Sequence, residues 1–200
     1  WSGSSRAPLE RARVEPRPQQ QPHPPLWIGS GASRQSIDLA AELGLGLVIP
    51  SIFQPVTTFV PYVDRYRRRF AERGHGEQPR VGACSHVHVA RDSQLARARW
   101  RPYHMGYTDW VNDTLLPWGQ ANMMPAGPPV ALDYDSLLRS SAICGSPAEV
   151  VDRILELHEQ LGLTLHLSIF DHGGLPRELL DDSLELFAAE VMPALRRALS

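Results

Sequence analysis

The chain has 200 residues, of which 20 are basic, 22 are acidic and 42% are apolar, and its formal net charge is −2. This apolar share is enough for a sizeable core and excludes wholesale disorder, while the balanced charge offers no broad basic surface to nucleic acid. All the basic residues are arginine, which excludes a lysine Schiff base and a P-loop lysine.

No apolar run approaches the roughly 18 residues that a transmembrane helix needs, and no signal peptide is recognisable, so we expect no membrane association. Cys84 and Cys144 cannot build a disulfide framework, which favours a cytoplasmic location. Because the chain starts at Trp1 and not at methionine, we expect it to be a piece of a longer protein.

The first predicted segment is a proline-rich extended connector over residues 1–25, because proline fixes φ and removes backbone donors. From residue 26 the sequence predicts regular helices and strands. A short apolar strand over 26–29 leads through a glycine-bearing turn to Ser33, a helix N-cap. The spacing then predicts a helix over 34–43, ended by Gly44, and a second apolar strand over 46–50.

A helix over 58–73 follows, with one apolar stripe and Gly74 at its end, and then a strand over 80–90. Asp92 is the expected N-cap of a helix that passes Trp100. Residues 102–135 contain five prolines and are expected to be irregular. Long insertions of this kind are often lids, and its aromatic and methionine side chains suit an apolar substrate pocket, although packing under a long loop is the alternative.

The last third of the chain starts with a capping box at 146–149 that carries proline at the first helical position. This helix runs to Leu161 and stops at Gly162. A strand over 164–170 comes next, and then a final helix with one apolar face made by Leu180, Leu184, Phe187 and Val191.

Alternation of strands and helices, with two strands apolar throughout, predicts an α/β fold with a parallel sheet covered by helices. Four strand–helix units are present, whereas a closed (β/α)8 barrel needs twice as many and about 250 residues. Two interpretations follow: a small open sheet, or half of a barrel.

The turn over residues 29–36 joins a strand to a helix N-terminus, where unpaired N–H groups and the helix dipole favour a phosphate. Ser33 and Ser36 add hydroxyl groups, and Arg34 adds a positive charge. The alternative is a tight turn with an ordinary serine cap.

Histidines provide the other candidate site. The period of the 80–90 strand places Cys84, His86 and His88 on one face. They could chelate a metal, but no nearby carboxylate completes the set, so we expect no metal site and favour satisfied core histidines. His166 and Ser168 form a similar face on the 164–170 strand, and if the two strands are parallel neighbours, the two faces could share one interior.

His172 follows the 164–170 strand at the end where α/β folds bind ligands. It is therefore a candidate acid–base or ligand contact, and the alternative is a turn residue before the last helix. The arginines at 65–69 are most simply a solvated helix face.

Several motifs, taken in order, resemble the luciferase-like flavin-dependent monooxygenases. They are VEPRP at 14–18, QPHPPLWIG at 21–29, CGSP at 144–147, DHGGLP at 171–176, SLELF at 183–187 and EVMP at 190–193. Many members read Trp-Ile-Gly-Gly, whereas this chain has Ser30 between Gly29 and Gly31.

This resemblance implies a (β/α)8 TIM-type barrel of which the chain holds strands five to eight (residues 26–200), with the insertion at 102–135. It implies a cytoplasmic homodimer that uses reduced FMN and molecular oxygen on a small, partly apolar organic substrate. Deazaflavin-dependent hydride transfer and a truncated, non-catalytic flavin-binding remnant are the alternatives. The flavin phosphate would meet Ser30, Gly31, Ser33 and Ser36. Catalytic residues of the family lie in the first half, so His86, His88 and His172 are only weak catalytic candidates.

Overall fold

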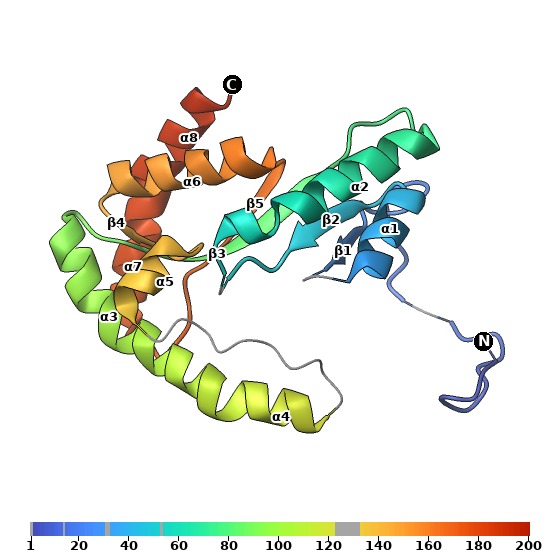
Figure 1. The fold of residues 1–200 in the computed structure, drawn as a ribbon, viewed down its shortest axis with the longest axis horizontal. Helices are drawn as coiled ribbons and strands as arrows, with labels where there is room; N and C mark the ends of the chain where they lie inside the picture. The colour runs from blue at the N-terminus through green and yellow to red at the C-terminus, as the bar shows by residue number, and fades with distance from the viewer. Residues whose placement is uncertain (1, 14, 31–32, 53, 123–132) are drawn as a thin grey trace.

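A computed structural model describes residues 2–13, 15–30, 33–52, 54–122 and 133–200. Residues 2–13 and 15–25 contain neither helix nor strand, and all are exposed except the half-buried Pro24. In Figure 1 this segment lies away from the sheet. The strands are β1 (Trp27–Gly29), β2 (Gly46–Ile49), β3 (Val81–Val89), β4 (Ile143–Gly145) and β5 (Leu165–Ile169).

Helices connect these strands. The α-helices are α1 (Arg34–Glu42), α2 (Val60–Arg73), α3 (Ser93–Trp110), α4 (Leu116–Ala121), α5 (Tyr134–Arg139), α6 (Pro147–Leu161), α7 (Arg177–Leu186) and α8 (Met192–Ala198). A 3₁₀ turn, η1 (Val56–Thr58), precedes α2, and two π-helical segments, η2 (Val111–Leu115) and η3 (Phe187–Val191), continue α3 and α7. Among the described residues, no helix is both long enough and apolar enough to cross a membrane.

All the strand pairs are parallel, as predicted, and β3 is the strand that joins the others. It pairs with β2 from Val81 to Ala83, with β5 from Gly82 to His86, and with β4 from Val87 to Val89. β1 pairs with β2 and, within the described residues, with no other strand. Figure 1 shows α1 and α2 near β1 and β2, with α6, α7 and α8 gathered on the side of β4.

The main core lies between one face of the sheet and the helices that cover it. Alternate residues of β2 and β3 point into it, and α1, α2 and α6 supply the opposite side chains. Each fully buried aliphatic side chain contributes about 1.5–3 kcal/mol relative to an exposed one. The fully buried members include Ile37, Leu47, Ile49, Tyr66, Val81, Val87, Val150, Leu157 and Leu161.

The predicted helix boundaries are confirmed where a specific cap marks them. Ser33, Asp92 and Ser146 each accept a hydrogen bond from the backbone N–H three residues later. Gly74 and Gly162 end α2 and α6 with positive φ values of 65° and 56°. Each of these caps depends on one residue type at one position, so the sequence alone predicts these helix boundaries.

The expectation that residues 102–135 are irregular is wrong for much of the segment. α3 continues through Pro102 to Trp110, and η2 and α4 extend the helical path to Ala121. Burial of Trp100 and His104 on either side of Pro102 offsets the lost hydrogen bond. Pro117 follows the π-helical segment η2, where the hydrogen-bond ladder is already shifted and the Leu116 N–H bonds to the Val111 carbonyl. Residues 123–132 lie outside the described residues, so the lid remains a prediction.

The structure also adds a strand that we did not predict. β4 is only three residues long and pairs with the last residues of β3. All three of its residues are buried. Only Ile143 and Cys144 are apolar before Gly145 and the helix cap that follows, so the sequence shows no strand pattern here, and pairing with β3 defines the strand.

Candidate functional site

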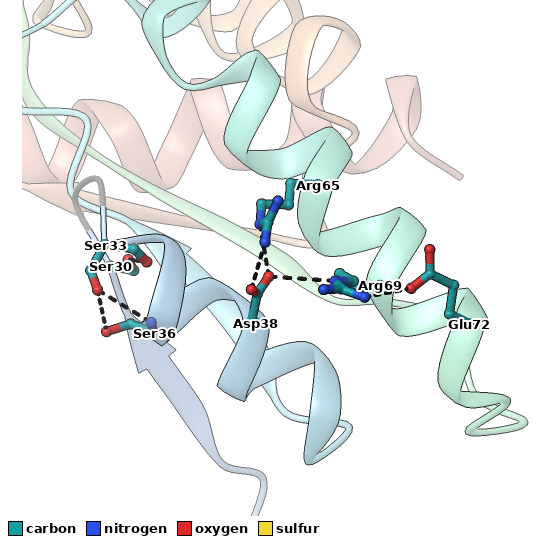
Figure 2. A network of polar contacts seen from close by, with 7 residues as sticks. All are labelled: Ser30, Ser33, Ser36, Asp38, Arg65, Arg69 and Glu72. Atoms are coloured by element: carbon teal, nitrogen blue, oxygen red, sulfur yellow. Dashed lines mark hydrogen bonds and ion pairs between the residues drawn. The ribbon is translucent and has the colours of Figure 1, made fainter.

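Ser30, Ser33 and Ser36 form one hydrogen-bonded group where β1 ends and α1 begins (Figure 2). Ser33 Oγ accepts from the backbone N–H of Ser36 at 3.3 Å and from the Ser36 hydroxyl at 3.1 Å. The Ser30 hydroxyl is buried and donates to the Ser33 carbonyl at 3.2 Å. Gly31, the other residue expected to meet a phosphate, lies outside the described residues.

These bonds decide which hydroxyls remain able to donate outward. The single proton of Ser30 is used inside the turn, so this residue fixes the turn's shape. Ser33 is exposed and accepts both bonds from Ser36, which leaves its own proton for an acceptor in solution. The first N–H groups of α1 also lack acceptors within the helix. The turn is thus a donor-rich corner at the carboxyl end of β1.

Asp38 lies one turn further along α1, and its charge is neutralised by arginines of α2. Arg65 donates to it through two nitrogens at 2.8 and 2.6 Å, and Arg69 lies at 3.8 Å (Figure 2). The hydrogen bond from Arg65 holds the pKa of Asp38 below its usual value. No acidic residue lies in the first turn of α1. An anion at this corner would therefore meet little opposing charge.

Three buried histidines meet at the carboxyl end of β5, beside the middle of β3. His86 comes from β3, His104 from α3 and His172 from the segment after β5. His104 Nδ1 and His172 Nε2 lie 2.9 Å apart, a hydrogen-bond distance. The His86 ring stacks on the His172 ring with centroids 4.3 Å apart and is 5.4 Å from the His104 ring. We call these three residues the histidine cluster.

Aromatic side chains of α3 enclose the histidine cluster. The Trp100 ring stacks on His104 with centroids 4.1 Å apart, and Tyr107 meets the edges of His86 and His172 at 5.2 and 5.7 Å. Burial in this apolar wall lowers the pKa of His86 to about 2, of His104 to about 3 and of His172 to about 4. For His86 and His104, neighbouring histidines lower it further. All three imidazoles are therefore neutral at neutral pH.

The structure brings together two of the three histidines proposed as catalytic candidates, His86 and His172. The third, His88, lies outside the cluster and stacks on the other side of the wall, on Trp100, with ring centroids 6.3 Å apart. Sequence reasoning missed His104 because the segment that holds it was expected to be irregular. The available signal was the four-residue spacing from Trp100, which places both residues on one helical face.

The expectation that His166 shares an interior with His86 is wrong. The register pairs His166 with Ala83 and Ser168 with Ser85, so these residues lie on the face opposite His86. His166 Nε2 lies 3.1 Å from Ser85 Oγ, and its Nδ1 lies 3.1 Å from Ser168 Oγ. Strand periodicity alone does not tell which faces of two strands coincide, because register does.

His166 should make the fold sensitive to acid. Burial lowers its pKa from 6.5 to about 4. Between pH 6.5 and about pH 4 the unfolded chain binds a proton at this histidine that the folded chain does not bind. The free energy of unfolding therefore has its full value above pH 6.5 and falls as the pH drops towards 4. His166→Asn keeps a polar partner for Ser85 and removes the titration, a difference of about 2 kcal/mol between pH 7 and pH 5.

Urea unfolding of both proteins at about pH 7 and about pH 5 measures this effect. The variant should lose less stability between the two pH values than the unsubstituted chain. His23→Asn, at an exposed position, is the control and should follow the unsubstituted chain. Equal losses in the His166 variant and the unsubstituted chain would contradict the assignment.

A cavity of about 410 Å³ lies between α3 and α7, in the size range of small-molecule pockets. Its described lining includes His88, Arg99 and Asp182, but neither His86 nor His172. Arg99 and Asp182, which both line it, form an ion pair at 3.6 Å. Helix α3 therefore lines this cavity and also encloses the histidine cluster, but the cavity and the cluster are separate.

The sequence profile of one family, described as luciferase-like monooxygenase, matches residues 1–164. The chain belongs to the luciferase-like monooxygenase family. This membership agrees with the motif resemblance, although the profile match covers the helices and strands only up to the start of β5.

Three proteins are similar to this chain over most of its length. The oxygenase component of the flavin-dependent trigonelline monooxygenase of Acinetobacter baylyi is 24% identical over 191 residues, 90% of this chain and 51% of that protein. Monooxygenase RslO1 of Streptomyces bottropensis has a TM-score of 0.70 at 22% identity, over 90% of this chain and 51% of that one. The oxygenating constituent of 3,6-diketocamphane monooxygenase from Pseudomonas putida, solved in complex with FMN, has a TM-score of 0.65 at 24% identity. It is matched over 86% of this chain and 49% of its own.

The chain spans about half the length of these luciferase-like relatives. Their fold and the parallel strands β1, β2, β3 and β5 confirm the predicted fold class, an α/β structure that forms part of a (β/α)8 barrel. Of the two interpretations of the sequence, the partial barrel is therefore correct.

Proposed function

We propose that this chain forms the phosphate-binding half of a flavin-dependent monooxygenase that uses reduced FMN and molecular oxygen on a small, partly apolar organic substrate. The observation that carries the proposal is the donor-rich serine corner at the carboxyl end of a parallel strand, in a chain of the luciferase-like monooxygenase family. A homodimer is part of the same proposal.

The serine corner fits a phosphate by the chemistry of its donors. Ser33 has an outward hydroxyl proton, Ser36 is half-buried beside it, and the first N–H groups of α1 point the same way. Arg34 is exposed in the first turn, and Arg65 and Arg69 offset the charge of Asp38 behind it. No carboxylate of the first turn opposes the anion.

A reduced flavin held there would supply the electrons with which oxygen is activated. The chain's own part is to hold the phosphate at Ser33, whose hydroxyl Ser36 orients through the two bonds that it donates, and to fix the turn through Ser30. At the carboxyl ends of β3 and β5, α3 covers the strands with Trp100 and Tyr107, which excludes water from this side of the barrel.

Comparing FMN with riboflavin in one variant tests the phosphate site. Ser33→Asp keeps a good N-cap but places a negative charge beside the phosphate. We expect it to weaken FMN binding at least about tenfold, a loss of about 1.4 kcal/mol, while riboflavin, which has no phosphate, binds as before. Fluorescence titration measures both affinities.

Ser146→Asp is the matched control, because Ser146 is also a serine N-cap but begins α6. It should leave the FMN affinity unchanged. Equal FMN affinities for Ser33→Asp and the unsubstituted chain would refute the phosphate site.

Two alternatives have their own support. An F420-dependent secondary alcohol dehydrogenase, solved with an F420–acetone adduct, has a TM-score of 0.60 at 15% identity over 97% of this chain. Deazaflavin-dependent hydride transfer predicts that F420 binds more tightly than FMN in the same titration.

A non-catalytic remnant agrees with the half-length match and predicts no oxygen-dependent turnover when reductant and FMN are added.

A further inference from the structure

We propose that the histidine cluster, His86, His104 and His172, binds one divalent transition metal ion, with zinc as the best-suited probe. One ligand nitrogen from each residue lies within 4.8 Å of the other two, and all three side chains are buried. Among the described residues, this is the set of side chains placed to hold a metal.

The set differs from the one that led us to expect no metal. That expectation concerned Cys84, His86 and His88, which follow one another along β3. His88 turns towards Trp100 instead, and α3 and the segment after β5 supply the two further imidazoles. The structure thus replaces a weak local pattern by three ligands from distant parts of the chain.

The donor chemistry selects the type of ion. Imidazole nitrogen suits zinc, copper, nickel and iron, whereas calcium and magnesium prefer oxygen ligands. Three histidines with a fourth position left open is a known arrangement for zinc. Each ligand nitrogen must be free of a proton, so the proton shared by His104 Nδ1 and His172 Nε2 has to move to another ring nitrogen when the ion binds.

The geometry requires a small closure of the cluster. Tetrahedral coordination at about 2.0–2.1 Å places ligand nitrogens about 3.3 Å apart. The 2.9 Å pair, His104 Nδ1 and His172 Nε2, must widen slightly. His86 is stacked almost parallel to His172, at 18°, so its ring must rotate to turn a nitrogen towards the ion.

A second observation concerns the ring nitrogens outside the 2.9 Å contact. His104 Nε2 and His172 Nδ1 are both buried and have no hydrogen-bond partner among the described residues. Buried polar atoms of this kind in folded proteins call for an explanation.

Zinc alone is the probe, and the 200-residue chain is the sample. After chelator treatment, the chain is incubated with zinc and gel-filtered, and metal content is measured by mass spectrometry. We expect one zinc per chain. His86→Gln, His104→Gln and His172→Gln should each lower the zinc affinity at least about tenfold.

His88→Gln is the matched control, because His88 is equally buried on the same strand but lies outside the cluster. It should keep its zinc. Background zinc in the unsubstituted chain would overturn the proposal, as would equal affinities in the cluster variants and the control.

A measurement on the unsubstituted chain guards against variants that fail to fold. Cobalt replaces zinc, and its visible absorption distinguishes tetrahedral nitrogen coordination from the hexa-aqua ion. A tetrahedral spectrum supports the cluster, and the spectrum of the free ion contradicts it. Neither measurement depends on flavin. A failure of the metal proposal can therefore be distinguished from a failure of the proposed function.

Discussion

Replacing Trp100 with alanine should lower the free energy of unfolding by about 3–5 kcal/mol, the range for truncating a buried aromatic side chain. Trp100 is fully buried, stacks on His104 and meets the edge of His172 at 5.3 Å. Its loss leaves a hole between α3 and β3 that the strand cannot move to fill. Urea unfolding measures the change.

Trp118→Ala is the control, because Trp118 is 60% exposed on α4, and it should stay within about 0.5 kcal/mol of the unsubstituted chain. Trp100→Phe separates packing from polarity. Trp100 Nε1 is buried without a partner among the described residues, a cost of about 1–3 kcal/mol, so phenylalanine should lose far less than alanine. Equal losses at Trp100 and Trp118 would contradict the packing described for α3.

Gly173→Ala should destabilise the chain by about 1–3 kcal/mol more than Gly174→Ala, the cost of overpacking. Both glycines have positive φ, 67° and 72°, so both variants bear the same left-handed penalty of about 1–2 kcal/mol. A Cβ at Gly173 would lie 2.3 Å from the Tyr103 carbonyl oxygen, whereas one at Gly174 would meet open space.

This pair of variants isolates one backbone contact, and the same urea experiment measures it. Gly173 adjoins His172 and Tyr103 adjoins His104, so the contact sets how closely two members of the histidine cluster approach. Gly173→Ala should therefore also weaken zinc binding more than Gly174→Ala does. Equal stabilities of the two variants would show that the chain relaxes around the added methyl group.

The sequence predicts best the features that neighbouring residues determine. Ser33, Ser146 and Gly162 mark helix ends through their own side chains or backbone, and the structure has those ends. The strands β1, β2, β3 and β5 follow from apolar runs, and their parallel order follows from the alternation with helices.

Features that distant residues determine were missed or misread. Pro102 indicates a helix break locally, but burial of α3 against β3 outweighs it. His166 was placed on the wrong face because register is a long-range property. The cluster of His86, His104 and His172 needs three elements to be placed correctly at once, and one of them was expected to be irregular.

The pairing of β3 has a consequence for synthesis on the ribosome. Its neighbour β5 begins 84 positions after β3 begins, at Leu165 and Val81 respectively. Until β5 has emerged, β3 has a vacant edge, and parallel pairing over such separations is slow and exposed to aggregation. The nascent chain should therefore depend on chaperones late in translation, and a ribosome stalled before residue 165 should hold a protease-sensitive β3.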